Sequence, residues 1–165
     1  MTLRIARILL VASVALYHTL VVLNNTTDYG SNYQFVHHVL LMDTTFPGNH
    51  LMWRSIHSPF AYTAFYWCII AWEAVIMALA WIGAAQLLRA LRSPAADFNS
   101  AKRISIVALT VGMMLWFVAF ICVGGEWFLM WQSKTWNGLE TASRMFIMIG
   151  VVLMLLVLPD AELHS

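Results

Sequence analysis

Residues 59–88 read PFAYTAFYWCIIAWEAVIMALAWIGAAQLL, an apolar run that contains one acidic residue, Glu73, and no basic residue. Ser58 is a good helix cap before this run, Pro59 suits the first helical position, and Pro94 lies just beyond its end. A helix rises about 1.5 Å per residue, so roughly 20 apolar residues cross a hydrocarbon core of about 30 Å. The run therefore predicts a membrane-spanning helix over residues 59–91 that is long enough to tilt or project.

Three further apolar blocks, at residues 3–23, 104–125 and 139–158, have the composition of membrane-spanning helices. The chain of 165 residues is 61% hydrophobic and 10% charged, which is far from the composition of soluble proteins. These features predict an all-α fold, a four-helix transmembrane bundle in a single integral membrane domain. We expect spans at about 3–23, 59–91, 103–131 and 139–158, with an outer loop at 24–58 and a cytoplasmic link at 92–102.

Basic residues are unevenly distributed along the chain. Most of them lie near the N-terminus or between the second and third spans: Arg4, Arg7, Arg89, Arg92, Lys102 and Arg103. Because basic residues concentrate on the cytoplasmic side of membrane proteins, we expect both termini in the cytoplasm. The start of the chain also fits a secretory signal peptide, although an uncleaved first span agrees better with this charge distribution. A net charge of +1 without a basic run gives no support for nucleic-acid binding.

The outer loop at 24–58 has the composition of an ordered segment. Asn24 and Asn25 begin a polar stretch that is expected to end the first span. Asn32 is expected to cap a short amphipathic helix over residues 33–42, which suits the bundle top or the membrane surface. Residues 43–49, DTTFPGN, are typical of a turn. Tryptophans near the outer ends of the spans indicate an interfacial aromatic belt.

Ionisable groups inside the predicted spans are candidates for function, because charges in hydrocarbon are costly unless they are paired. The candidate polar network consists of Glu73, Arg144, Glu140, His18 and Glu126. Glu73 should face the bundle interior, with Arg144 at a similar depth on an opposed helix. Two pairings are open: a bridge from Glu73 to Arg144, or a local pair of Arg144 with Glu140 four residues earlier. A structural role and a proton, ion or substrate site both fit.

Histidine and cysteine positions define the remaining candidates. A haem site inside the bundle would need a histidine on another span at the depth of His18, and no other predicted span holds one, so no cofactor is predicted. His18 is instead expected to form an interhelical hydrogen bond. The candidate interaction or metal site in the outer loop consists of His37, His38, Asp43, His50, His57, Trp53 and Arg54. Its spacing matches no named metal motif, so metal binding and interfacial packing both stay open. For Cys68 and Cys122, separate buried side chains are favoured over a disulfide.

Four segments of the chain carry a resemblance to a known family. They are residues 25–32 (NTTDYGSN), 35–40 (FVHHVL), 42–47 (MDTTFP) and 52–54 (MWR). Through them the chain resembles, over nearly its whole length, a bacterial family of predicted small integral membrane proteins, domain of unknown function 2165. The resemblance implies a bacterial inner-membrane protein and no known activity. The four-span layout is also similar to claudin-type proteins in architecture alone, since their paired loop cysteines are missing here.

The sequence leads to several hypotheses about function. No nucleophile elbow, phosphate-binding glycine loop or zinc-spaced cysteine pair occurs, so an enzyme is not predicted. The leading hypothesis is a non-catalytic accessory or scaffold subunit in the lipid bilayer, whose partners are other membrane proteins or a second copy of itself. The alternative is a small transporter or proton-coupled protein that uses Glu73 with Arg144 and His18. A second alternative is a subunit of a membrane redox complex.

Overall fold

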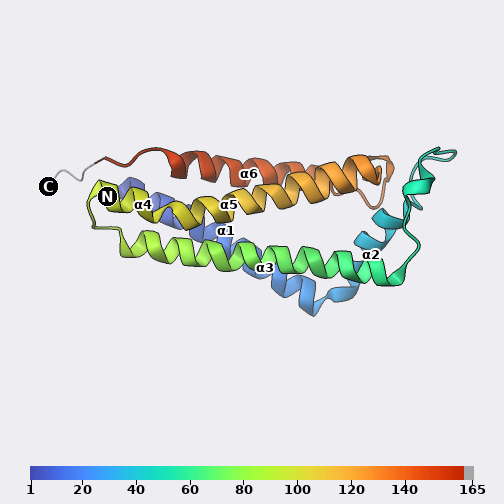
Figure 1. Cartoon of the computed structure of the whole chain (residues 1–165), viewed down its shortest axis with the longest axis horizontal. Coiled ribbons are helices and arrows are strands. Elements are labelled where there is room, and N and C mark those ends of the chain that lie inside the picture. Colours follow the sequence, from blue (N-terminus) through green and yellow to red (C-terminus); the bar gives the residue numbers. More distant parts are fainter. Residues whose placement is uncertain (162–165) are drawn as a thin grey trace.

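The computed structural model describes residues 1–161, which form helices joined by turns, with no strand among them (Figure 1). Four helical segments in this range are long and apolar enough to cross a membrane: Thr2–Thr27, Pro59–Arg89, Ala95–Trp127 and Leu139–Val157. They lie lengthwise beside one another and form a bundle. The all-α, four-span fold predicted from the sequence is therefore confirmed.

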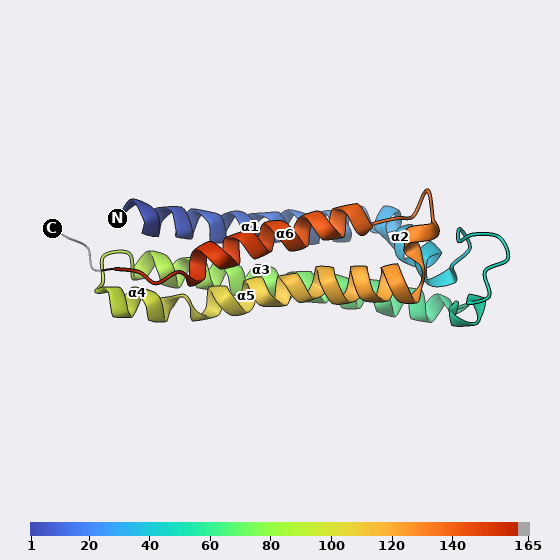
Figure 2. The same cartoon turned by 90° about the horizontal axis from the view of Figure 1, so that it is seen from above.

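The two ends of the bundle differ in structure (Figures 1 and 2). The loop end holds α2 (Tyr29–Leu41) and the turns at 42–58 and 128–138. The opposite end, named here the terminal end, holds the first residues, α4 (Ala95–Ala101) and residues 158–161. α1 (Thr2–Thr27) packs against α3 (Pro59–Arg89) and runs diagonally across the bundle. It therefore diverges from α6 (Leu139–Val157) toward the loop end (Figure 1).

α3 begins where the sequence predicts and ends two residues before the predicted position, at Arg89. The Ser58 hydroxyl oxygen caps it by accepting a hydrogen bond from the Ala61 amide at 3.3 Å, and Pro59 occupies the first turn. Its buried positions recur every three or four residues, as expected for a helix with one face in the core. They include Tyr62, Tyr66, Ile70, Glu73, Ile76 and Ala80. This spacing places Glu73 on the packed face.

The third span differs from the prediction at both ends. The predicted link at 92–102 is helical over α4, and α5 (Arg103–Met114) follows after the single residue Lys102. The helix then continues as η2 (Leu115–Trp127), which has π-helical hydrogen bonding from residue i to i+5. It ends at Trp127 instead of 131, because Leu129 adopts a left-handed backbone conformation with φ 56°, which a helix cannot continue through.

The first span and the loop helix have bounds other than those predicted. α1 continues past Asn25 to Thr27. The buried Asn25 side chain bonds to other helices, and such tertiary contacts override the weak helix propensity of asparagine. α2 starts at Tyr29, four residues before the predicted start, so Asn32 lies inside the helix and does not cap it. The helix closes at Met42, where φ is 58°.

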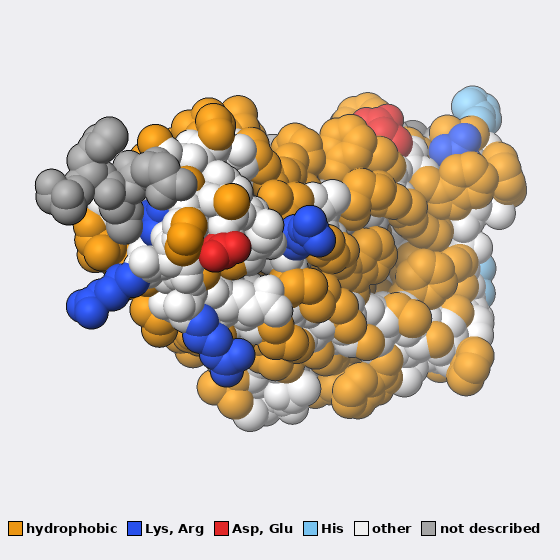
Figure 3. Space-filling model, turned by 60° about the vertical axis from the view of Figure 1, so that its left-hand side comes forward, with side chains coloured by type: hydrophobic (Ala, Val, Ile, Leu, Met, Phe, Trp, Pro, Cys, Tyr) orange, Lys and Arg blue, Asp and Glu red, His pale blue; other side chains and the backbone are white. Residues whose placement is uncertain are grey.

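Charged side chains tie the beginning of the chain to Asp160 at the terminal end. Arg4 and Arg7 are each 1% exposed and donate to the Asp160 carboxylate at 2.7 and 3.0 Å. Lys102 and Arg7 both donate to the Leu158 carbonyl, at 2.6 and 3.0 Å. Figure 3 looks toward this end and shows basic side chains gathered there, while hydrophobic side chains cover the sides of the bundle.

Small residues allow α3 and α5 to approach closely. A Cβ atom added to Gly83 would lie 2.8 Å from the Ser105 backbone nitrogen, so the two helix backbones nearly touch at this point. Nearby, Ala15, Ala80 and Ala108 are fully buried where α1, α3 and α5 meet. This packing agrees with the enrichment of small residues at helix contacts in membranes.

Cys68 and Cys122 are both free and exposed. The expectation that they are buried is therefore wrong, because the rotation of α3 and η2 turns them to the outside of the bundle. A thiol on an apolar outer surface is compatible with lipid contact, since cysteine behaves as a small hydrophobic residue.

Candidate functional site

Glu73 is the most unusual polar residue of the bundle. It lies near the middle of α3 and is 2% exposed. Its carboxylate accepts a hydrogen bond from the Asn25 side-chain amide at 2.6 Å. Taking a carboxylate out of water is costly in free energy unless partners compensate for the lost hydration. The surroundings of Glu73 are therefore the first place to look for function.

Asn25 is the centre of a hydrogen-bonded network that joins three helices. Its side-chain amide donates to Glu73 of α3, and its side-chain oxygen accepts from the Asn32 amide of α2 at 2.7 Å. The Tyr66 hydroxyl of α3 donates to the Asn25 backbone carbonyl at 3.1 Å. Asn25 and Tyr66 are 6% and 2% exposed, so the bonds of Asn25 to Glu73 and Tyr66 are shielded from solvent, whereas its bond to the exposed Asn32 lies nearer the surface. The network holds the Glu73 carboxylate in one orientation.

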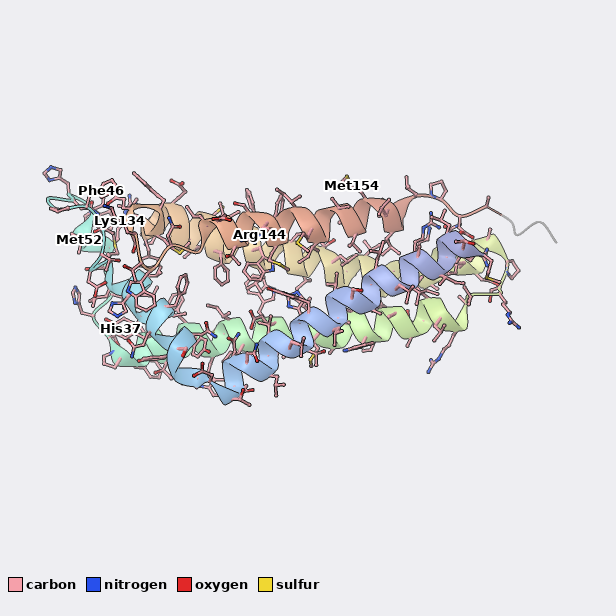
Figure 4. The ribbon with its side chains drawn as sticks, turned by 180° about the vertical axis from the view of Figure 1, so that it is seen from behind. His37, Phe46, Met52, Lys134, Arg144 and Met154 are labelled. Atoms are coloured by element: carbon pink, nitrogen blue, oxygen red, sulfur yellow. The ribbon has the colours of Figure 1, made fainter. Side chains whose placement is uncertain are left out.

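The other acidic and basic residues of the predicted network do not join Glu73. Arg144, labelled on α6 in Figure 4, pairs with Glu140 at 3.3 Å, and both side chains are exposed. Of the two pairings left open by the sequence, the structure has the local one, and Glu73 and Arg144 form no bridge. Glu126 is exposed on η2. The bridge from Glu73 to Arg144 is therefore wrong, whereas the local pair of Arg144 with Glu140 is present. Depth along a helix does not fix the direction in which a side chain points, so Arg144, Glu140 and Glu126 face outward while Glu73 faces inward.

His18 lies inside the bundle but forms no interhelical hydrogen bond. The residue is fully buried, and neither ring nitrogen has a hydrogen-bond partner among residues 1–161. Its ring contacts Tyr17 edge to face, with the ring centroids 5.3 Å apart. The expected hydrogen-bonding role of His18 is wrong for this structure, since its neighbours around Gly112 are the apolar Ile76 and Ile149.

A cavity of about 540 Å³ opens beside Glu73. It lies between α1, α2, α3, η2 and the turn that leads into α6. The residues that line it are Val21, Asn24, Asn25, Ser31, Asn32, Phe35, Val36, Tyr66, Ile69, Glu73, Trp116, Phe120, Thr135, Trp136, Asn137, Gly138 and Thr141. Cavities that bind small molecules span roughly 300 to 1,000 Å³. In the lining, Glu73 is the one acidic or basic residue.

The lining changes from exposed polar residues at the mouth to buried residues at the inner wall. The mouth is marked by the exposed residues Asn24, Asn32, Thr135, Asn137 and Thr141. Glu73, Tyr66 and Trp116 form the inner wall and are each at most 5% exposed. A ligand that entered would pass amide and hydroxyl groups before it reached the carboxylate.

The π-helical part of the third span supplies two aromatic walls. Trp116 and Phe120 both line the cavity, with ring centroids 4.8 Å apart. Residues four apart lie on the same face of a helix, so Trp116 and Phe120 point to the cavity together. The Trp116 indole nitrogen has no hydrogen-bond acceptor among residues 1–161. Trp116 and Phe120 are not among the site residues predicted from the sequence, because nothing distinguishes them there from the other apolar residues of this span.

An apolar groove of about 250 Å³ adjoins the cavity. The two spaces share the lining residues Phe35, Val36, Ile69 and Phe120. Beyond these, the groove runs along α3 past Cys68 and Trp72 and along η2 past Gly124, and no charged residue contributes to its lining. A polar cavity and an apolar groove thus meet at one junction.

The structure brings together part of the predicted outer-loop site: the His37 and His38 rings lie with centroids 5.0 Å apart, whereas His57 bonds elsewhere and His50 is exposed. His38 Nδ1 lies 2.7 Å from the Asp43 carboxylate, and its ring stacks on Trp136 with centroids 4.7 Å apart. His57 bonds instead to the Ser55 hydroxyl, at 2.9 Å. His37, labelled in Figure 4, has its ring beside Tyr62, and His50 is exposed. Among residues 1–161 there is no group of three or more His, Cys, Asp or Glu residues that could hold a metal ion.

Trp53 and Arg54 connect the 42–58 turn to the third span. The Arg54 guanidinium carbon lies 5.3 Å from the Trp53 ring centroid and 4.7 Å from that of Trp127, and Arg54 donates to the Trp127 carbonyl at 3.3 Å. Trp53 is 70% exposed, which is typical of tryptophan at a membrane interface. Phe46 and Met52 lie at the same end (Figure 4). These contacts order the loop end and place no reactive group there.

Comparison with known proteins gives one match. A family model described as "Predicted small integral membrane protein (DUF2165)" matches residues 3–159. No curated protein and no solved structure matches the chain.

Proposed function

Since the chain belongs to this family of small integral membrane proteins, we propose that it is a non-catalytic accessory protein that binds a small ligand in the cavity beside Glu73. One observation carries the proposal: a buried carboxylate lines a cavity and has an amide partner but no ion-pair partner among residues 1–161. A ligand that brings a hydrogen-bond donor or a positive charge would compensate for the lost hydration of Glu73.

The packing beyond the cavity supports binding rather than conduction. From Glu73 toward the terminal end, the next buried positions of α3 are Ile76 and Ala80, both fully buried. Ala15 of α1 and Ala108 of α5 pack against Ala80 in one buried cluster. Ions cross membranes along polar or wetted routes. The fully buried His18 lies beside Ile76 at this level, and neither of its ring nitrogens has a hydrogen-bond partner among residues 1–161, so no hydrogen-bonded route continues from Glu73 past the apolar side chains. The cavity therefore has its mouth at one end only.

The charge distribution supports an orientation for the cavity. Basic residues gather at the terminal end, which favours a cytoplasmic location of that end in a bacterial inner membrane. The cavity mouth then faces the outside, or the outer half of the bilayer. An accessory role for the protein is supported by its exposed aromatic side chains at the loop end, which include Trp53 at 70% and Phe60 at 82% exposure. Such residues suit contact with lipid and with other membrane subunits.

Native mass spectrometry of the protein extracted from its own membrane in a mild maltoside tests the proposal. We expect a bound non-protein mass on the wild type and on the control variant Glu140→Gln, which loses an exposed acid of α6. The variant Thr141→Trp narrows the cavity mouth and should bind this ligand about tenfold or more weakly, so that the bound mass is largely lost. A tenfold change in affinity corresponds to about 1.4 kcal/mol of binding free energy. Equal retention of the mass by Thr141→Trp would contradict cavity binding.

A proton-coupled transporter is the second candidate, favoured by the burial of Glu73 between three helices. In that case the carboxylate would take up and release a proton during transport. Proteoliposomes that contain the wild type should then show pH-driven uptake of a substrate, and Glu73→Gln should abolish it. Binding without uptake by the wild type would favour the accessory role instead.

A further inference from the structure

We propose that the ligand is an amphiphile with one cationic ammonium head group, which sits beside Glu73 while its apolar chain lies in the groove between α3 and η2. This inference rests on the proposed ligand-binding function and names the class of ligand. Three observations carry it: the charge of the cavity, the aromatic composition of its walls, and its junction with the groove.

The charge of the cavity selects a cation. Glu73 is the only acidic or basic residue of the lining, and the base that the sequence offered as its partner, Arg144, is exposed and bonded to Glu140. An ammonium group beside Glu73 would form the ion pair that the protein itself does not supply. Phosphate and sulfate head groups need basic partners, so the lining does not suit them.

The walls of the cavity are suited to the same group. Five aromatic side chains line it: Phe35, Tyr66, Trp116, Phe120 and Trp136. Aromatic faces attract ammonium ions, and they attract them more strongly where water is excluded, as at the buried Tyr66 and Trp116. The unpartnered Trp116 indole nitrogen can in addition donate to an oxygen atom in the linker next to the head group.

The junction with the groove selects an amphiphile over a small soluble cation. Phe35, Val36, Ile69 and Phe120 line both spaces, so a molecule can lie across the junction without leaving the protein surface. The Phe35 and Phe120 rings lie face to face there, with centroids 6.5 Å apart. The groove beyond them is apolar and faces outward at Phe65 and Cys68, which are exposed. An alkyl chain in this groove would remain in contact with the bilayer.

The experiment measures binding of four probes to the full chain in maltoside micelles, by native mass spectrometry and by intrinsic tryptophan fluorescence. The probes are hexadecyltrimethylammonium, the neutral hexadecyl maltoside, the anionic hexadecyl sulfate, and tetramethylammonium, which has the head group without the chain. We expect hexadecyltrimethylammonium to bind at least about tenfold more tightly than each of the others. Tighter binding of the sulfate, or equal binding of the neutral probe, would overturn the cationic head group.

Variants of the cavity lining test where the head group binds. Glu73→Gln keeps the shape of the side chain and should remove the preference for the cationic probe, whereas the control Glu140→Gln should keep it. Trp136→Leu leaves the carboxylate in place and should weaken cationic binding by about two- to fivefold, so the inference is testable even where Glu73→Gln does not fold. An unchanged preference in folded Glu73→Gln would overturn the proposal, and so would unchanged cationic binding in Trp136→Leu.

The assignment of the alkyl chain to the groove has its own test. Ile69→Trp fills the junction and should make hexadecyltrimethylammonium bind no better than tetramethylammonium, while Val75→Trp on the exposed face of α3 should not. Tetramethylammonium that binds the wild type as tightly as the long-chain probe would overturn the groove assignment. If the neutral probe binds and Thr141→Trp abolishes its binding, the cavity function stands and only the cationic class fails. If no probe binds and no mass co-purifies, both proposals fail.

Discussion

Asn25 is the residue on which the geometry of the cavity depends most. Its amide donates to Glu73, its side-chain oxygen accepts from Asn32, and its backbone carbonyl accepts from Tyr66. One side chain thus links α1 to both α2 and α3. Because a buried carboxylate without a donor is costly, the loss of Asn25 should affect stability as well as ligand binding.

Replacing Asn25 with alanine should lower the free energy of unfolding by about 1 to 3 kcal/mol, because Glu73 then loses its donor in a buried site. The measurement is a thermal or detergent-induced unfolding curve of the purified protein in maltoside. Asn24→Ala is the matched control, since Asn24 is the preceding residue and is exposed, and it should change stability by less than about 0.5 kcal/mol. An equal loss in both variants would show that the network contributes nothing specific.

Sequence reasoning found Glu73 but not its partners, and the reason is geometric. An isolated acid in a long apolar run must be buried or paired, so its importance follows from composition. The partner depends on how each helix is rotated, and this rotation is set by the packing of all helices at once. From the sequence alone, Asn25 is expected to mark the end of a span, and Arg144 can pair equally well with Glu73 or with Glu140.

At the scale of elements, the approach of α3 to α5 determines the width of the bundle. Gly83 allows the two backbones to meet at Ser105, while η2 takes π-helical geometry further along the same span. The terminal half is thus closely packed, and the loop half is wider and holds the cavity.

Gly83→Ala should destabilise the protein, because the new Cβ would lie 2.8 Å from the Ser105 nitrogen and would force α3 and α5 apart. We expect a loss of about 1 to 3 kcal/mol, in the range for overpacked sites. Gly30→Ala is a suitable control, since a Cβ at this position in α2 meets nothing within 4 Å. It should leave stability unchanged or raise it slightly, because alanine favours helix. Unfolding curves of both variants compare them directly.

The presence and order of the four spans were predictable, whereas the bounds of the first and third spans and the irregular elements were not. Hydrophobic length marks a span regardless of how it packs, so α3 was predicted to within two residues. α4 was missed because Ser93 and Pro94 indicate a break, whereas the helix resumes directly after them at Ala95. Which apolar side chains of η2 line the cavity depends on how this helix is rotated in the bundle, and one sequence does not reveal that rotation.

At the scale of the whole molecule, the terminal cluster of Arg4, Arg7 and Asp160 joins α1 to the segment after α6. Asp160→Asn should lower the free energy of unfolding by about 3 to 5 kcal/mol, because two buried guanidinium groups lose their carboxylate. Asp97→Asn, which alters an exposed acid on α4, is the control and should change little. Both are measured by unfolding in maltoside, and equal stability of the two variants would contradict a structural role for the cluster.

The proposed orientation in the membrane is open to a labelling test. In a background with Cys68→Ser and Cys122→Ser, we expect Lys134→Cys at the loop end to react with a membrane-impermeant maleimide on intact bacterial cells. Arg89→Cys at the terminal end should react only after the cells are permeabilised, because the basic end is expected in the cytoplasm. The reverse pattern of labelling would place the cavity mouth inside the cell.

The link between Arg4 and Asp160 also has a consequence for biosynthesis. The two residues are separated by 156 positions, so the ribosome makes the arginine long before the aspartate that neutralises it. Until Asp160 is made, the nascent first helix carries two guanidinium groups without the carboxylate that pairs with them in the folded protein. Correct assembly can therefore be completed only after the final span has been inserted, and a chain cut short before Asp160 would present those charges to the cell's quality-control proteases.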